Sequence, residues 1–500
     1  MGVQHFDVIM IGAGLSGIGT ACHIAKKCPD KTIAILERRE NMGGTWDLFK
    51  YPGIRSDSDM ASFGFRFKPW LSSKVLAKGG DIRDYVIETA REYGLKDKVQ
   101  FGLKIIKSEW SSDDQHWKLT ALHEASGEEK HFTCGFLSNC TGYYNFDEGY
   151  SPEFAGSDDF KGKIIHPQHW PEDLDYSGKK VVVIGSGATA VTLIPSMSDK
   201  TEHITMLQRS PTYIMPLPDN DTMAVIMNKF LPQNWVFKFA RLRNTLFQRG
   251  LYLSAMRWPK VIRKLLLGAA KKRLGDGVDM RHFTPKYNPW EERLCAAPDG
   301  DLFECVKSGK ASVVTDHIDR FTEKGILLKS GTELEADIIV TATGLNIQMM
   351  GGMDVAIDGK KTSIAEKMVY KSVLIEDFPN FAWIFGYTNV PWTLKSDIAG
   401  QYICRLFKHM DANNLKTVTP IDSDNNRMDV GMLDEFAPGY VQRARNVLPR
   451  QGRSGPWKVL MHYGKDKKVL LNDPVVDGVL SFEKENVQAQ ESQQPNLKIA

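Results

Sequence analysis

Apolar runs and a glycine-rich turn alternate along the first part of the chain. Residues 6–11 and 32–36 have the apolar character of buried strands, and residues 18–27 form a helical pattern of small residues between them. The turn 12–17 joins the first strand to the helix. This order of strand, turn, helix and strand predicts a βαβ unit. A second unit of the same kind is predicted for residues 180–209, so the chain is expected to hold two dinucleotide-binding folds.

A long helical pattern follows the second unit. Residues 222–273 contain twelve Lys or Arg and no Asp or Glu, and large apolar residues recur between the charges at helical spacing. This predicts an inserted helical subdomain. Two interpretations of its charge stay open: a solvated basic face over a packed helical core, or peripheral contact with an anionic membrane surface. Because the whole chain has a formal net charge of only +3, the rest of the chain is net acidic.

Composition narrows the class of protein. A chain that is 42% hydrophobic and 25% charged has the balance of a soluble globular protein, and a net charge of +3 argues against a nucleic-acid binder. The seven cysteines include no C-x-x-C pair, which favours reduced thiols in the cytoplasm over a disulfide framework or a flavin disulfide reductase. The inner face of the cell membrane is the second location considered. No metal site is expected.

The first glycine-rich turn has the spacing of a phosphate-binding loop. Gly12 permits the tight turn, Gly14 lets the backbone approach a pyrophosphate, and Gly17 lets the helix pack on the strand. The amino end of the helix that follows Ser16 and Gly17 offers free N–H groups to the phosphates. Glu37 ends the second strand, twenty residues after Gly17. A carboxylate there accepts both ribose hydroxyls and repels a 2′-phosphate, which predicts FAD or NAD rather than a phosphorylated cofactor.

A second glycine-rich turn favours FAD at this first site. It comprises Gly43, Gly44, Thr45 and Trp46, at the place where flavoproteins bring a further turn to the cofactor. The short turns 140–142 and 342–344 have the form expected where a chain crosses out of an FAD domain and back into it. Strand-like sequence also returns at 311–314, 326–329 and 336–342.

The turn of the second unit is expected to bind NADPH. Its third glycine position is alanine, which still permits close packing. No acid ends the second strand; a guanidinium and a hydroxyl stand there instead, and both suit a 2′-phosphate. The candidate ligands are Gly185, Ser186, Gly187, Thr189, Arg209 and Ser210.

Two longer motifs carry a resemblance to a known family. Residues 160–171 fit F-x-G-x-x-x-H-x-x-x-W-P, with His166 and Trp170 at its defined positions, and residues 43–57 fit G-G-x-W-x-x-x-x-[FY]-P-G-x-x-x-D. Both resemble type I Baeyer–Villiger monooxygenases, a branch of the class B flavin monooxygenases, over about residues 5–470. Further segments look like the mycobacterial members of this family that activate the thioamide prodrug ethionamide.

The resemblance implies a defined activity. NADPH reduces the flavin, and dioxygen then gives a flavin C4a-peroxide that inserts one oxygen atom into a small ketone to form an ester. The same species can oxygenate the sulfur of a thioether or thioamide. Two alternatives stay open: a flavin monooxygenase that oxygenates nitrogen or sulfur without ketone activity, and a non-catalytic, membrane-peripheral flavoprotein. No nucleic-acid partner is expected, and the oligomeric state stays open.

The resemblance also assigns roles to residues. Arg293 is expected to stabilise the peroxide anion and the developing oxyanion, and Asp57 to hold this arginine near the flavin. The alternatives are an ion pair between domains for Arg293 and a helix cap for Asp57. His166 and Trp170 are expected to position the linker and NADP⁺.

One position departs from the family. Many relatives have Lys directly before the catalytic arginine, where it helps to hold the 2′-phosphate, but this chain has Glu292. Preference for NADPH should then depend mainly on Arg209. The substrate pocket is expected between the helical insert and residues 386–392.

The expected fold is α/β, with two Rossmann-like dinucleotide-binding domains in a glutathione-reductase-like arrangement and an inserted helical subdomain. The expected segments are 1–145 and 344–483 for the FAD-binding domain, 146–215 and 292–343 for the NADPH-binding domain, 216–291 for the basic helical insert, and 484–500 for a mobile tail.

Overall fold

The computed structural model describes residues 2–292, 294–434 and 439–486. Arg293 therefore lies outside the described residues. The predicted mobile tail at 484–500 also lies outside them, apart from its first three residues. No helix in the described ranges is long and apolar enough to cross a membrane.

The larger sheet forms the first nucleotide fold. Its order is β20-β19-β4-β5-β6-β1-β2-β3, and β23 joins it beside β6, followed by β22 and β21. β1 lies parallel to β2 on one side and to β6 on the other. The strands are β1 (Gln4–Ile11), β2 (Ile33–Leu36), β3 (Val99–Gln100), β4 (Leu103–Ser111), β5 (His116–His123), β6 (Glu128–Asn139), β19 (Asp354–Ile357), β20 (Lys360–Thr362), β21 (Val369–Tyr370), β22 (Leu374–Ile375) and β23 (Phe381–Trp383).

β6 connects two kinds of sheet. Its first residues pair antiparallel with β5, and its later residues pair parallel with β1 and β23. The alternating burial of β4 and β5 fits strands with one covered face, whereas β2 is buried throughout, as a parallel strand covered on both faces should be. The sheet is therefore a parallel core extended by an antiparallel meander.

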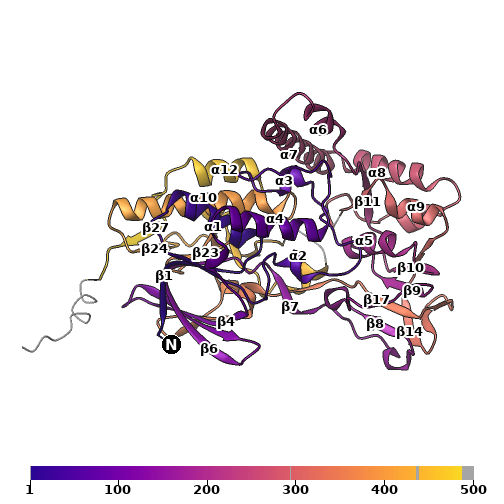
Figure 1. Ribbon diagram of the computed structural model, residues 1–500, viewed down its shortest axis with the longest axis horizontal. Coiled ribbons are helices and arrows are strands. Elements are labelled where there is room, and N and C mark those ends of the chain that lie inside the picture. Colours follow the sequence, from indigo (N-terminus) through magenta and orange to yellow (C-terminus); the bar gives the residue numbers. More distant parts are fainter. Residues whose placement is uncertain (1, 293, 435–438, 487–500) are drawn as a thin grey trace, which may run out of the picture.

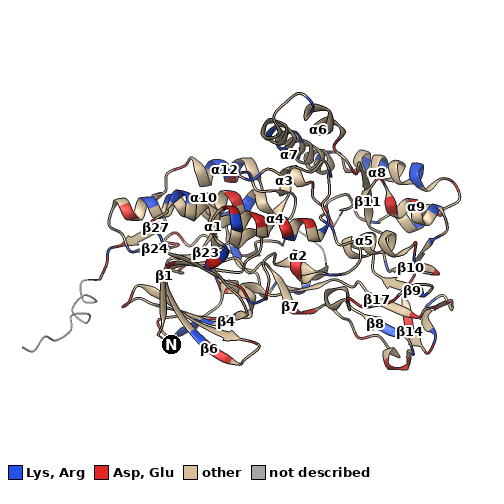
Figure 2. Cartoon of the chain, in the orientation of Figure 1, with Lys and Arg blue, Asp and Glu red and all other residues tan. Residues whose placement is uncertain are grey.

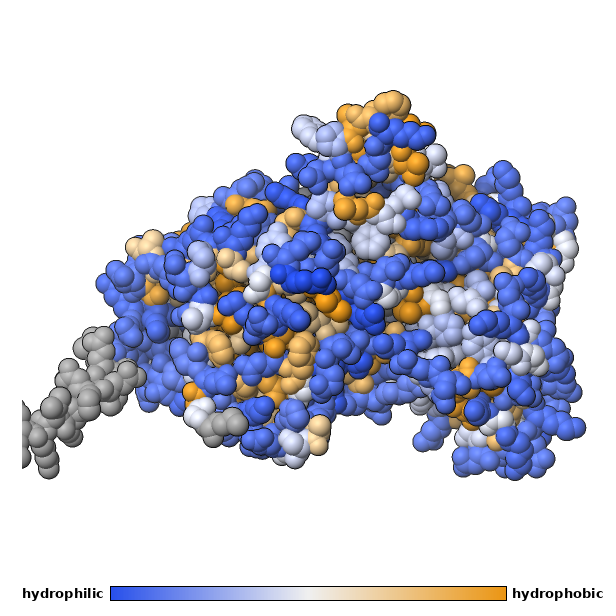
Figure 3. Space-filling view, viewed as in Figure 1, coloured by the Kyte–Doolittle hydropathy of each residue, from blue (hydrophilic) through white to orange (hydrophobic). Residues whose placement is uncertain are grey.

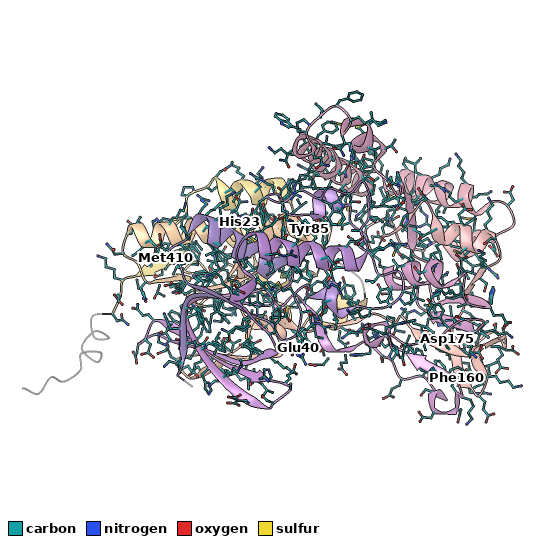
Figure 4. The ribbon with its side chains drawn as sticks, in the orientation of Figure 1. His23, Glu40, Tyr85, Phe160, Asp175 and Met410 are labelled. Atoms are coloured by element: carbon teal, nitrogen blue, oxygen red, sulfur yellow. The ribbon has the colours of Figure 1, made fainter. Side chains whose placement is uncertain are left out.

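Helices cover one face of the parallel core (Figure 1). They are α1 (Leu15–Lys27), α4 (Gly79–Glu92), α10 (Trp392–Ala412) and α12 (Tyr463–Leu471). α1 and α10 pack closely because Gly400 has no side chain: a Cβ there would lie 3.2 Å from the Cα of Thr20. Tyr85 of α4, labelled in Figure 4, accepts a hydrogen bond from the Phe65 amide and donates to the Lys68 carbonyl. This side chain anchors the loop that leads toward the site.

The smaller sheet forms the second nucleotide fold and is wholly parallel, in the order β13-β10-β9-β17-β8. Its core strand β9 is an apolar run that is buried after its first residue. The members are β8 (Lys163–Ile165), β9 (Lys180–Ile184), β10 (His203–Gln208), β13 (Ala311–Thr315) and β17 (Ile338–Thr341), with α5 (Ala188–Met197), α9 (Asp301–Lys307), and the antiparallel β14 (Ile318–Thr322), β15 (Gly325–Leu328) and β16 (Glu333–Glu335). The prediction of two Rossmann-like folds is confirmed.

The segment 222–273 is helical, as predicted. It forms α6 (Thr222–Met227), α7 (Gln233–Arg257) and α8 (Pro259–Leu274). α6 and α7 stand at the top of Figure 1, whereas α8 packs beside α9 and β11 on the second fold. α8 begins at Pro259, and no helical hydrogen bond is lost there because the first N–H groups of a helix have no partner within it. The insert leaves and rejoins the fold through the parallel pair β11 (Tyr213–Leu217) and β12 (Leu294–Pro298).

Two linkers connect the nucleotide folds, and they pair with each other. β7 (Tyr144–Gly149) runs out and β18 (Leu345–Ile347) runs back as an antiparallel ribbon. The domain boundaries given above stay a prediction. The remaining α-helices and strands of four residues or more are α2 (Thr45–Leu48), α3 (Met60–Phe63), α11 (Gly439–Arg443), β24 (Thr417–Pro420), β25 (Arg427–Gly431) and β27 (Leu480–Glu483); β26 (Arg450–Gly452) pairs with β25.

Candidate active site

One large cavity, of about 1020 Å³, lies where the first nucleotide fold, the linkers and the insert meet. Its wall includes residues 387–392 and part of α7, the two parts of the chain between which the substrate pocket is expected. Eight of the residues proposed for the flavin side line it together: Gly12, Gly14, Ser16, Glu37, Gly44, Thr45, Trp46 and Asp57. Gly17 is not among the lining residues.

The two glycine-rich turns of the first fold, residues 12–17 and 43–46, lie against each other with no side chain between Gly14 and Gly44. Gly12 has φ +101°, and a Cβ there would lie 2.8 Å from the Cys140 carbonyl oxygen. A Cβ on Gly44 would lie 3.1 Å from the Cα of Gly14. At Gly17 a Cβ would lie 1.8 Å from the Gly12 carbonyl oxygen, so this glycine serves packing and not ligand approach. The amino end of α1 and these turns form a cradle that fits a dinucleotide pyrophosphate.

Glu37 is held in place at the end of β2. Its Oε2 accepts a hydrogen bond of 2.7 Å from the Ala13 amide, and Oε1 accepts one of 2.9 Å from the Arg39 amide. Burial raises the pKa of this carboxyl, and the two amide hydrogen bonds oppose the rise. The carboxylate lines the cavity in a fixed orientation, as the interpretation as a ribose ligand requires.

Trp392 joins the carboxyl-terminal wall of the cavity to the first turn. Its indole Nε1 donates a hydrogen bond of 2.8 Å to the Ser16 hydroxyl, and its ring stacks on Tyr143 with centroids 5.3 Å apart. Ser16 keeps its own hydroxyl proton to donate. The residues that precede α10 are therefore tied to the cofactor cradle.

Asp57 lies on the cavity wall with an exposed side chain. Trp290 and Glu292, which come just before Arg293, line the same cavity. The pairing of Asp57 with Arg293 stays a prediction because Arg293 is outside the described residues.

Asp59, two residues further on, was not singled out from the sequence. Its buried carboxylate caps α3 through the Ser62 amide at 3.0 Å. The same group accepts a hydrogen bond of 2.7 Å from Asn244 and another from Gln248, both on α7. It thereby anchors the insert to the flavin side. The capping pattern was visible in the sequence, but partners on a distant helix were not.

The glycine-rich turn of the second fold, residues 185–190, does not line this cavity. Gly185 has φ +134°, and a Cβ there would lie 2.4 Å from the Ala342 carbonyl oxygen. Gly187 precedes α5, and a Cβ there would meet nothing within 4 Å. The Ser186 hydroxyl donates to the Ser210 carbonyl at 2.9 Å, which brings the turn to the end of β10. Thr189 lies in the first turn of α5. This open backbone at a helix start fits a second pyrophosphate.

Arg209 and Glu292 lie close enough to influence each other. Burial raises the pKa of the Glu292 carboxyl, and the positive charge of Arg209 opposes that rise. Both side chains are exposed. An acid thus stands beside the guanidinium expected to bind a 2′-phosphate.

The motif at residues 43–57 also contacts the second fold. A Cβ on Gly53, which has φ +78°, would lie 2.6 Å from the Thr192 carbonyl oxygen of α5. Burial raises the pKa of Tyr51 to about 12, against side-chain hydrogen bonds to Thr192 and Thr189. This motif therefore forms part of the contact between the two nucleotide sites.

The other motif, at residues 160–171, lies on the linker side of the smaller sheet. His166 Nδ1 accepts a hydrogen bond of 3.2 Å from the Gln168 amide, and Nε2 donates to the Gly344 carbonyl at 3.2 Å. Burial lowers the pKa of this imidazole. Phe160, labelled in Figure 4, packs edge-on against Phe321, and Trp170 is buried in the core of the second fold. His166 thus contacts the returning linker through Gly344, and its role in positioning NADP⁺ stays a prediction.

Comparison with known proteins agrees with this geometry. A family model described as flavin-binding monooxygenase-like matches residues 74–378, and a model described as an NAD(P)-binding Rossmann-like domain matches residues 10–72. The chain belongs to the flavin-binding monooxygenase-like family. The assignment confirms the resemblance and the expected flavoprotein monooxygenase with FAD and NADP as cofactors.

Several relatives of this flavin monooxygenase match it over nearly their full length. The putative FAD-containing monooxygenase MymA of Mycobacterium tuberculosis is 59% identical, with 96% of this chain and 98% of the relative covered. The FAD-containing monooxygenase EthA of Mycolicibacterium smegmatis is 50% identical over the same shares. The probable FAD-binding monooxygenase AlmA of an Acinetobacter species is 50% identical, with 97% and 98% covered.

Solved structures share the fold of this flavin monooxygenase. Steroid monooxygenase bound to NADP superposes with a TM-score of 0.75 at 19% identity, covering 96% of this chain and all of that one. OTEMO in complex with FAD and NADP gives 0.75 at 20% identity with the same coverage. Cyclohexanone monooxygenase with bound ε-caprolactone gives 0.70 at 20% identity, covering 84% and 90%.

Proposed function

We propose that this flavin monooxygenase inserts one oxygen atom of dioxygen into small ketones to give esters, and also oxygenates thioethers or thioamides. The observation that carries the proposal is the single cavity that joins the flavin cradle, Asp57 and the residues just before Arg293. The complete W-P ending of the motif at residues 160–171 favours ketone oxidation over nitrogen or sulfur oxygenation alone. The ε-caprolactone bound in the cyclohexanone monooxygenase structure is a cyclic ester, the class of compound that the proposed reaction forms.

The residues have distinct tasks in this proposal. FAD supplies the ring that activates dioxygen, and NADPH supplies the hydride. Gly12, Gly14 and Glu37 hold the first dinucleotide through its pyrophosphate and ribose. Arg293 provides a fixed positive charge where the substrate carbonyl oxygen becomes negative, and Asp57 orients that arginine.

The residues of the second site hold the coenzyme. Gly187 and Thr189 present the amino end of α5 to its pyrophosphate, and Arg209 and Ser210 bind the 2′-phosphate. His166 and Trp170 set the angle between the folds. We propose a cytoplasmic enzyme, since all seven cysteines are free in the structure, which suits a reducing compartment.

Product analysis tests the reaction class. Purified protein is mixed with NADPH and phenylacetone under ¹⁸O-labelled dioxygen, and benzyl acetate is analysed for the label. Labelled ester supports the proposal. Sulfoxide from a thioether without any ester would instead identify a sulfur-oxygenating enzyme, and NADPH oxidation that yields only hydrogen peroxide would contradict both activities.

The role of Arg293 is tested by Arg293→Ala. Because the cation acts after hydride transfer, we expect flavin reduction by NADPH to persist while the yield of ester falls by at least a hundredfold, about the loss caused by removing one oxyanion-stabilising donor. Stopped-flow reduction and product yield measure the two steps. Arg320→Ala, at an exposed site on β14, is the control. An Arg293→Ala enzyme with normal ester yield would refute the assignment.

A further inference from the structure

The helical insert presents an unusual amount of apolar surface to solvent. Of the 21 large apolar side chains that are exposed in the described ranges, 15 lie between residues 223 and 265. Phe230 is 80% exposed and Trp235 is 68% exposed. Figure 3 shows this surface as the orange cluster at the top of the molecule, above a largely hydrophilic body. Exposure on this scale marks a contact surface.

Six of the seven exposed large apolar residues of α7 form one stripe, and Phe247 lies outside it. The stripe residues are Trp235, Phe239, Leu242, Leu246, Leu253 and Met256. Their spacing of three and four residues places them on one side of the helix, and Arg249 fills the gap in the series. The opposite side carries Val236, Phe237 and Ala240, which are buried. The outer face of this segment is therefore apolar as well as basic.

Cations surround the stripe. Eight of the twelve basic residues of 222–273 are exposed: Lys229, Lys238, Arg249, Arg257, Lys260, Lys264, Lys271 and Lys272. Lys238 lies over the Trp235 ring at 5.8 Å. Because no acid occurs in 222–273, α6, α7 and α8 carry only blue and tan in Figure 2. Two identical copies of this face would bring like charges together, which opposes self-association.

We propose that the outer face of α6, α7 and α8 rests on an anionic lipid bilayer. Apolar side chains that enter the acyl region below basic side chains at headgroup level are the arrangement by which amphipathic helices bind such surfaces. Cations with long aliphatic stems keep their charge at the headgroups while the rest of the face is buried.

The active-site cavity lies against the other side of α7, and Phe247 lies between that side and the stripe. Phe247 is 61% exposed and also lines the cavity, together with Gln248 and Leu251 of α7. For a molecule dissolved in the bilayer beneath α7, Phe247 offers an apolar contact next to Leu246 of the stripe and at the edge of the cavity. On the basis of the proposed monooxygenase function, the substrates are lipid-soluble ketones or sulfur compounds that the enzyme takes up from the membrane.

Vesicle flotation tests the surface. The double variant Leu242→Glu/Leu246→Glu alters the stripe at two exposed residues that do not line the cavity. The holoenzyme should bind vesicles of phosphatidylglycerol and phosphatidylcholine, bind pure phosphatidylcholine weakly, and lose affinity as salt rises. The variant should bind about tenfold more weakly or worse. Ile421→Glu/Val476→Glu, at exposed apolar sites elsewhere, should bind as the unaltered enzyme does.

Two results would overturn the proposal. One is the absence of vesicle binding, or equal binding by the stripe variant. The other is a dimer in solution that the stripe variant converts to monomers, since the face would then belong to a second copy. Light scattering measures this. Normal flavin reduction by NADPH in the variant shows that it is folded.

Turnover tests the uptake route separately. Anionic vesicles should raise the rate on a long-chain ketone dissolved in them at least severalfold for the unaltered enzyme and not for the stripe variant, while both oxidise water-soluble phenylacetone equally. Equal stimulation of both proteins would exclude uptake through this face. If neither ketone is oxidised, the proposed function fails, and flotation still decides the membrane contact.

Discussion

Coenzyme choice depends on two side chains that oppose each other. Arg209 stands at the end of β10, where a 2′-phosphate is expected, and Glu292 lies within its electrostatic reach. A carboxylate at this point attracts the guanidinium and repels a phosphate. The pair therefore should weaken the discrimination between NADPH and NADH, compared with relatives that have a second cation there.

Substitution of each partner separates the two effects. Arg209→Ala removes a charge-assisted hydrogen bond of about 1.5–3 kcal/mol, so kcat/KM for NADPH should fall roughly ten- to hundredfold with little change for NADH. Glu292→Lys should raise kcat/KM for NADPH and leave that for NADH near its original value. Steady-state kinetics with both coenzymes measure this. Equal effects on the two coenzymes would contradict the 2′-phosphate assignment.

At the scale of elements, the glycines of the turn 12–17 have different structural roles. Gly17 lets α1 approach the Gly12 carbonyl, and Gly14 leaves room between the two turns. The first role concerns the protein alone, whereas the second concerns a ligand.

Alanine substitution distinguishes these roles. Gly17→Ala places a methyl group against backbone that cannot yield, and it should lower the free energy of unfolding by about 3 kcal/mol, the upper range for overpacking. Gly14→Ala meets only ordinary contacts, so the chain should fold but bind FAD weakly. Urea unfolding and flavin content measure the two outcomes. Gly80→Ala, in open space on α4, is the control; a stable, flavin-loaded Gly17→Ala protein would refute the packing role.

The sequence predicted these elements well because their signals are local. The turns 12–17 and 185–190 and the strands around them follow from glycine spacing and apolar runs within about thirty residues. The pairing of β7 with β18 and the Asp59 contacts with α7 join segments far apart in the chain, and no local pattern encodes them. The apolar outer face of α7 was also missed, because helical spacing alone does not say which side faces solvent.

At the scale of the whole molecule, His166 connects the two linkers. Its ring occupies the space above Gly149 of β7 and bonds the Gly344 carbonyl next to β18. Because Nδ1 accepts the Gln168 amide, only the neutral imidazole fits. Protonation of Nδ1 would break the contact with the Gln168 amide, whereas the hydrogen bond from Nε2 to the Gly344 carbonyl would remain.

This gives a pH dependence with a defined sign. The folded-state pKa of His166 lies below the ordinary 6.5, so the unfolded chain takes up the proton first and stability falls as pH drops below about 6.5. His166→Gln should lose less stability between pH 7 and pH 5.5 than the unaltered enzyme, as measured by urea unfolding. The exposed His131→Gln should behave like the unaltered enzyme. An identical pH dependence in His166→Gln would contradict the assigned contact.

The linker ribbon constrains how the enzyme can move. Two separate strands would let the nicotinamide half swivel in any direction, but β7 and β18 are bonded to each other, and Thr343 and Asn346 fasten the returning strand to the Tyr150 and Gly149 carbonyls. The two folds should therefore rotate relative to each other about one hinge axis and not about several. Each opening would then follow the same arc, and the coenzyme would return to the same position over the flavin in every turnover.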